Sequence, residues 1–372
     1  MGATEPDLHY LELTELAARI KAREISPVAV TRSQLARIAS VDAALGGYAL
    51  VMADVAMTEA ASAEAEIAAG RYRGPLHGVP IAVKDLFWTK GFPTAAGMAI
   101  YKDFRPHDDA TVVRRLKEAG AVLLGKLQMT EGAYSDHHPS VTPPKNPWNA
   151  DYWPGISSSG PGVATASGLC FGALASDTGG SIRWPSAANG VTGLKPTWGR
   201  VSRYGVFELA ATMDHVGVMA RSAADAGAML NAIAGSDPKD PTAVLDPAPD
   251  YLATAKQGVR GLRIGVDAAW NNDDVDPATR AAVSEAAEAF RSLGAIIVDV
   301  EFPDVTRAIA DWAPNCRLRR AWFHRGHPRR AGAHRQRRQP DGACRTSPAL
   351  AKGQPFPVHQ SRHRHGRLSA SR

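Results

Sequence analysis

A serine preceded by two glycines lies in the segment Asp177-Thr178-Gly179-Gly180-Ser181. Consecutive glycines allow a tight turn whose backbone N–H groups converge, and such donors can stabilise the oxyanion that develops when a carbonyl is attacked. Ser181 is therefore a candidate nucleophile. The triplet Gly-Gly-Ser is also common in ordinary turns, so a catalytic role for Ser181 depends on finding a base.

A serine hydroxyl becomes a good nucleophile only when a base takes its proton. Histidine is the usual base, but no Gly-x-Ser-x-Gly motif places a serine against any histidine of residues 1–316. A lysine made neutral by burial is the alternative, since desolvation destabilises its ammonium form. Lys84 ends the apolar run Ile81-Ala82-Val83 and is the best-placed lysine, although a lysine at a strand end is more often a surface residue.

Three consecutive serines, residues 157–159, lie between Gly155 and Gly160. A hydroxyl both donates and accepts, so a serine between a distant amine and the nucleophile can relay a proton that the two groups cannot exchange directly. A polar turn would explain the same residues without any chemistry. Both interpretations stay open from these residues alone.

The elements that must position these groups alternate between helix and strand patterns. Helices are expected at 11–22, 26–41, 53–69, 112–119 and 276–293, and strands at 81–85, 121–124, 262–266 and 295–300. This alternation predicts an α/β fold with a largely parallel or mixed sheet. Residues 155–205 contain eleven glycines, but an apolar or helical stretch at 163–175 favours a packed segment over a flexible linker.

The net charge of +6 is unevenly distributed. Residues 317–372 carry fourteen Arg and one Lys against one acidic residue, Asp341, which leaves a net charge of −8 for residues 1–316. A basic end can bind nucleic acid. This one holds only six sizeable aliphatic or Phe side chains, too few for a core. We expect residues 1–316 to form an incomplete domain and 317–372 a basic, disordered or non-native tail, as out-of-frame reading of GC-rich codons would produce; nucleic-acid binding by this tail is the non-enzyme alternative.

The chain shows no pattern of secretion or membrane insertion. Four acidic residues interrupt the first 25 positions, and no later stretch reaches about 18 apolar residues. The three cysteines, Cys170, Cys316 and Cys344, lie far apart without a CxxC or zinc-site spacing. We expect reduced thiols, a cytoplasmic location and no metal.

The segments around Lys84, Ser157 and Ser181 resemble the amidase signature family. The likeness covers nearly all of residues 1–316 and is carried by residues 74–85, 125–131, 146–148 and 155–201. It implies a single domain with a central mixed, twisted β-sheet flanked by helices. Family members usually continue well beyond this length, so the resemblance also implies that the C-terminal part of the domain is incomplete.

Carried over residue by residue, the resemblance makes Ser181 the acylated nucleophile, Lys84 the base and acid, and Ser157 the bridging serine; the separation of 24 residues between the serines matches the family. The peptide entering the bridging serine is cis in the family, where two glycines precede it, whereas this chain has Gly155-Ile156. The backbone N–H groups that the resemblance assigns to the oxyanion hole are those of Thr178, Gly179, Gly180 and Ser181.

The implied reaction is hydrolysis of a carboxamide to a carboxylate and ammonia or an amine, through an acyl-enzyme on Ser181 and without a cofactor. The expected ligand is a small amide, but the sequence identifies neither that amide nor the residues that bind it. A stand-alone amidase is the first interpretation. The alternatives are the A subunit of a glutamyl-tRNA amidotransferase and an inactive truncated remnant, and a homodimer is left open.

Overall fold

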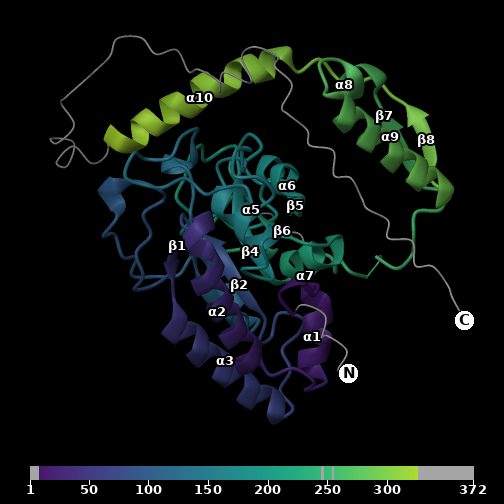
Figure 1. The fold of residues 1–372 in the computed structure, drawn as a ribbon. Helices are drawn as coiled ribbons and strands as arrows, with labels where there is room; N and C mark the ends of the chain where they lie inside the picture. The colour runs from purple at the N-terminus through teal and green to yellow at the C-terminus, as the bar shows by residue number, and fades with distance from the viewer. Residues whose placement is uncertain (1–7, 244–246, 254, 326–372) are drawn as a thin grey trace, which may run out of the picture. The chain divides into compact units, whose positions relative to one another are not determined.

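The computed structural model describes residues 8–243, 247–253 and 255–325 (Figure 1). These residues form two compact units. The larger unit comprises the described part of residues 8–256 together with 310–325, and the smaller unit comprises residues 257–309. Each unit is described by itself.

A six-stranded mixed sheet forms the centre of the larger unit, with the strand order β1-β3-β2-β4-β6-β5. The three central strands β3, β2 and β4 are parallel, and β1, β6 and β5 each pair antiparallel to a neighbour. The strands are β1 (Tyr48–Val51), β2 (Pro80–Lys84), β3 (Val122–Leu127), β4 (Gly172–Asp177), β5 (Thr192–Leu194) and β6 (His215–Ala220). This arrangement is the mixed, helix-flanked sheet that the sequence predicts.

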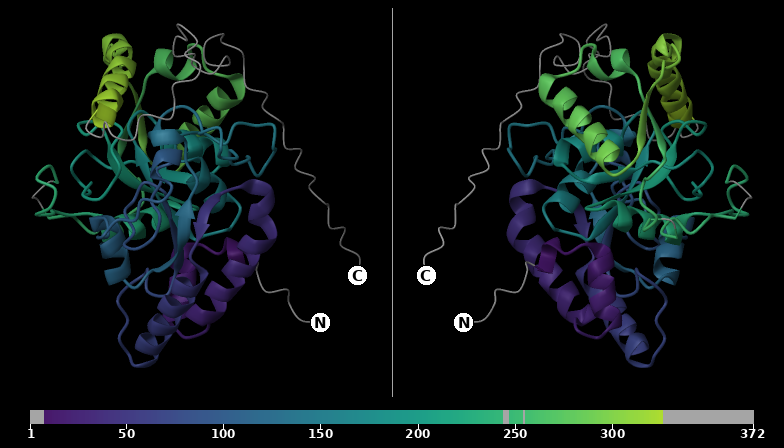
Figure 2. Two further views of the ribbon diagram at one scale, coloured as in Figure 1. Left: turned by 90° about the vertical axis from the view of Figure 1, so that its left-hand side faces the viewer. Right: turned by 90° about the vertical axis from the view of Figure 1, so that its right-hand side faces the viewer.

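Helices cover both faces of this sheet, and α2 and α3 lie side by side in Figures 1 and 2. The helices of the larger unit are α1 (Leu13–Lys21), α2 (Pro27–Leu45), α3 (Ala53–Ala68), α4 (Thr111–Glu118), α5 (Ser159–Ala166), α6 (Arg183–Asn189) and α7 (Ala223–Ile233), with short 3-10 turns at Leu8–Tyr10, Ala99–Tyr101 and Glu131–Ala133. One core cluster joins α1, α4 and α7, and a second joins α2, α3 and α5. Because both faces are covered, β2, β3 and β4 are buried along their whole length.

Strand β2 shows how the sequence directs Lys84. Side chains alternate between the two faces of a strand. Ile81 and Val83 belong to the first core cluster and Ala82 to the second, so Lys84 shares the face of Ala82, which packs with α5. Pairing of Lys84 with Leu127 of β3 fixes its register.

The smaller unit is a β-α-β arrangement in which β7 (Arg263–Val266) and β8 (Ile296–Asp299) pair in parallel. Helices α8 (Ala268–Asn272) and α9 (Pro277–Ser292) connect them. The Asp276 side chain caps α9 by accepting a hydrogen bond from Ala278 N–H at 2.8 Å, and Pro277 occupies the first helical position. The expected strand-helix-strand pattern at 262–300 is therefore present.

Two expectations about elements differ from the structure. The apolar stretch at 163–175 divides between α5 and β4 with a turn between them, because a hydrophobic run alone does not separate helix from strand. Helix α10 (Thr306–Arg325) continues past residue 316, since Leu, Arg, Ala and Trp are adequate helix formers. The rest of the predicted tail, residues 326–372, lies outside the described residues. Within the described part, no helix is long and apolar enough to cross a bilayer.

Candidate active site

Lys84 lies at the end of β2 with none of its surface exposed. Its Nζ is 2.8 Å from Ser157 Oγ, 2.9 Å from Ser158 Oγ and 2.9 Å from Ser176 Oγ. No carboxylate of the described residues comes within ion-pair distance of this nitrogen. The structure thus brings together two of the three residues assigned to catalysis, Lys84 and Ser157, and adds two hydroxyls that the sequence did not single out.

Burial lowers the pKa of Lys84 from 10.5 to about 7. The negative charges of Asp177 and Asp214 favour the ammonium form and oppose this shift, but they do not offset the loss of hydration. Near neutral pH the side chain is therefore divided between amine and ammonium. A group in that state can both take and return a proton.

Glycines allow the segment that carries Ser157 to pack closely. The peptide bond between Ile156 and Ser157 is cis, as the resemblance implies. A Cβ on Gly155 would lie 2.3 Å from Pro185 Cα, and one on Gly160 would lie 2.5 Å from backbone atoms of Gln128. Gly160 N–H also donates to Gln128 O at 2.9 Å, so Ser157 is held between the end of β3 and the start of α6.

Asp177 organises the loop that carries Ser181. Its carboxylate accepts hydrogen bonds from Gly180 N–H at 2.8 Å and Ile182 N–H at 3.1 Å, and from Arg183 Nε and Nη2 at 3.0 and 2.9 Å. Burial alone would raise the pKa of Asp177, but the Arg183 side chain and these N–H groups outweigh burial and lower it. The loop is thus wrapped around a carboxylate that stays ionised at neutral pH.

The same hydrogen bonds decide which N–H groups are free. Gly180 N–H is already used by Asp177, whereas the N–H groups of Thr178, Gly179 and Ser181 have no acceptor among the described residues. The Ser181 hydroxyl likewise makes no hydrogen bond within the described part of the chain. Of the three residues assigned to the oxyanion hole in addition to Ser181, Thr178 and Gly179 present an unused donor in this conformation.

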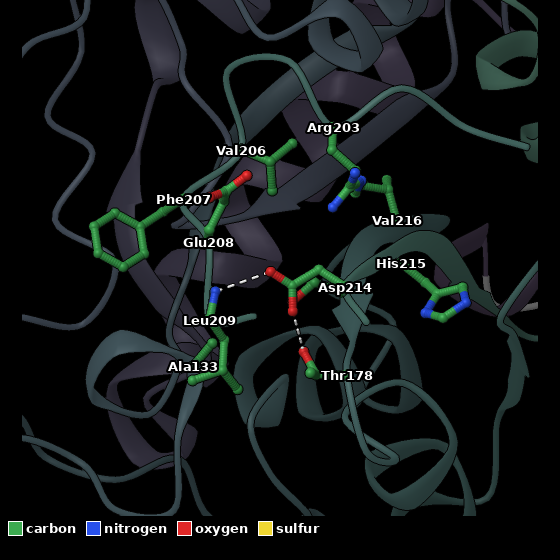
Figure 3. Close-up of a pocket in the computed structure, with 11 residues that line it drawn as sticks. Ala133, Thr178, Arg203, Val206, Phe207, Glu208, Leu209, Asp214, His215 and Val216 are labelled. Atoms are coloured by element: carbon green, nitrogen blue, oxygen red, sulfur yellow. Dashed lines mark hydrogen bonds between the residues drawn. The ribbon is translucent and has the colours of Figure 1, made fainter. Parts of the chain in front are cut away.

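A small pocket adjoins this loop, and its lining includes Ser176, Thr178 and Asp214 (Figure 3). Asp214 accepts hydrogen bonds from the Thr178 hydroxyl at 2.6 Å and from the N–H groups of Leu209 and Ala210 at 2.9 and 3.0 Å. Burial raises the pKa of Asp214, against the opposing effect of these donors. Asp214 therefore fixes the first residue of the nucleophile loop to the segment before β6.

The histidines do not offer a competing base. His137 Nε2 lies 3.0 Å from Ser159 Oγ, and His215 Nδ1 lies 3.2 Å from Asp177 O. No histidine in the described part of the chain hydrogen-bonds to Ser157 or Ser181. The geometry thus favours lysine over histidine as the base.

Comparison with known proteins identifies the class. The family model described as Amidase matches residues 29–318, more than half of the chain. The chain therefore belongs to the Amidase family, and its solved relatives share the same mixed α/β fold.

Three relatives show how far the similarity extends. AmiD of Mycobacterium tuberculosis, a protein named as an amidase, is 53% identical over 291 residues, which cover 78% of this chain and 61% of AmiD. The glutaminyl-type relative, the A chain of the glutamyl-tRNA(Gln) amidotransferase of Anaeromyxobacter dehalogenans, is 45% identical over 82% of this chain and 62% of its own length. The peptide amidase of Stenotrophomonas maltophilia superposes with a TM-score of 0.75 at 39% identity, covering 81% of this chain and 64% of that structure. The chain thus spans about 61 to 62% of the length of the two curated relatives.

Proposed function

We propose that the chain carries the catalytic machinery of an amidase that hydrolyses a small carboxamide through an acyl-enzyme on Ser181. The observation that supports this most directly is the fully buried Lys84, with a pKa of about 7 and a hydrogen bond to Ser157. Family membership supports the reaction class.

The hydrogen-bond capacities of the cluster indicate the path of the proton. A neutral amine has two N–H donors and one lone pair, so one of the three hydroxyls around Lys84 must donate to Nζ. Ser158 is committed elsewhere, because its hydroxyl donates to Ser176 O at 3.3 Å. Ser157 or Ser176 therefore donates to the amine. When Ser157 does so, its own oxygen is free to accept the proton of Ser181.

Acylation then proceeds with one bond formed and one broken. Ser181 Oγ bonds to the amide carbon as its proton passes to Ser157 and the Ser157 proton passes to Lys84 Nζ. The N–H groups of Thr178, Gly179 and Ser181 stabilise the oxyanion, and the proposal leaves Gly180 out because Asp177 holds its N–H. The C–N bond breaks as the ammonium returns its proton through Ser157 to the leaving nitrogen, and water cleaves the ester by the same route.

A second candidate function is that of the A component of an amidotransferase, favoured by 45% identity to such a protein over 82% of this chain. In that case the chain would hydrolyse glutamine for a partner protein. Measurement of glutaminase activity with and without a B component separates the two functions. Free amide turnover without any partner supports the stand-alone amidase.

Labelling with a fluorophosphonate tests the proposal. The full chain should become labelled, and Ser181→Ala should lose the label, whereas Ser135→Ala, at an exposed serine outside the site, should keep it. Ser157→Ala should slow labelling strongly, because Lys84 then has no relay to Ser181. Labelling of Ser181→Ala at the wild-type rate would refute Ser181 as the nucleophile.

A further inference from the structure

Two partly exposed tryptophans form a pair on the larger unit. Trp153 is 38% exposed and Trp184 is 43% exposed, with ring centroids 6.2 Å apart and planes inclined by 56°. Tryptophan is usually largely buried, and a contiguous exposed apolar patch commonly marks a binding surface. Neither indole nitrogen has a hydrogen-bond partner among the described residues.

The pair lies on the two segments that carry the proposed catalytic serines. Trp184 stands three residues after Ser181, in the first turn of α6, and its N–H donates to Gly180 O at 2.7 Å. Its ring lies against Gly180, where an added Cβ would be 2.8 Å from the indole. Trp153 stands four residues before Ser157. The two segments meet where Gly155 packs on Pro185.

The charge around the pair selects among ligands. Arg183 precedes Trp184, and its side chain is 54% exposed, so its positive charge disfavours a cationic guest. Inclined aromatic rings separated by 4.5–7 Å attract one another, and their free faces can take a further ring in the same way. The surroundings thus favour a neutral aromatic group.

We propose that Trp153 and Trp184 form a subsite for a neutral aromatic ring carried by the amide substrate. This inference rests on the proposed function, because it takes Ser181 to be the reacting group, and it adds the class of substrate: aryl or arylalkyl amides rather than small aliphatic ones.

Binding can be measured without turnover. In the full chain with Ser181→Ala, isothermal titration should show phenylacetamide binding at least tenfold more tightly than acetamide. Adding Trp184→Ala should weaken phenylacetamide binding at least fivefold and leave acetamide unchanged, and Trp184→Phe should restore most of the difference. The control is Trp148→Ala, since Trp148 is 72% exposed and its indole N–H is bound to Asn189 O, outside the pair; it should bind both amides like its parent.

Three results would overturn the subsite: equal affinity for the two amides, phenylacetamide binding that Trp184→Ala leaves intact, or a Trp184-dependent self-association in sedimentation with no effect on phenylacetamide, which would make a second copy the occupant. The proposed function fails separately, when Ser181 is neither labelled nor required for turnover although ring-selective binding persists. Ser181-dependent hydrolysis without any preference for the ring refutes the subsite alone.

Discussion

Replacing Lys84 by Met tests whether this lysine is neutral in the folded protein. Met has a similar length and keeps the core filled, but it neither titrates nor hydrogen-bonds as a donor. The lowered pKa of Lys84 means that the unfolded chain binds this proton more tightly than the folded chain between about pH 7 and 10.5. Wild-type stability therefore rises with pH in that window, and the contribution of Lys84 to this rise disappears in the variant.

The size of the effect follows from the two pKa values. With the proton at pKa 10.5 in the unfolded chain and about 7 in the folded one, linkage gives a destabilisation of about 4 kcal/mol at pH 7 and about 1 kcal/mol at pH 10. Loss of three hydrogen bonds from Nζ costs the variant about 3 kcal/mol at every pH. Lys84→Met should thus be about as stable as wild type at pH 7 and about 2 kcal/mol less stable at pH 10.

Urea unfolding at pH 7, 8, 9 and 10 measures this difference. The matched control is Lys126→Met on the neighbouring strand β3, where a buried lysine lies 3.3 Å from Asp85. Removing Lys126 leaves that carboxylate buried without its partner, so this variant should lose about 3–5 kcal/mol already at pH 7. A Lys84→Met variant whose deficit relative to wild type is the same at pH 7 and pH 10 would refute the neutral lysine.

Three further outcomes are expected. The second-order rate of Ser181 acylation by an amide should rise with pH through a midpoint near 7, because only the amine form of Lys84 accepts a proton; a flat profile from pH 6 to 9 would argue against this base. Thr178→Val should lower stability by about 1–3 kcal/mol in urea unfolding and slow fluorophosphonate labelling, since buried Asp214 loses its hydroxyl donor, whereas Thr178→Ser should keep both properties. Gly180→Ala, at φ +130° and against an indole ring, should cost more stability and labelling than Gly70→Ala, at φ +81° in open space; equal effects would show that the ring contact is unimportant.

Local sequence predicted the parts of the site that depend on local sequence. The apolar run before Lys84 identified a buried strand, and residues 157 and 181 stood out because serines follow glycines. Asp214 gave no such signal, since its link to Thr178 spans 36 residues and a lone aspartate in a loop has no recognisable pattern. The antiparallel position of β6 beside β4 is likewise set by pairing between distant segments. Composition did mark the change near residue 316, but helix propensity carries α10 beyond it.

Two buried lysines on adjacent strands show why one of them suits proton transfer. Lys126 Nζ donates to the Phe87 carbonyl at 2.7 Å and the Thr94 hydroxyl at 3.0 Å, and it lies beside Asp85. A carbonyl oxygen can only accept, and a carboxylate stabilises the positive charge, so these partners favour the ammonium. The partners of Lys84 are three hydroxyls, which accept from an ammonium and donate to an amine with equal ease. Only the Lys84 environment therefore serves both charge states, and a residue that must take a proton from Ser181 and return it to the leaving nitrogen needs both.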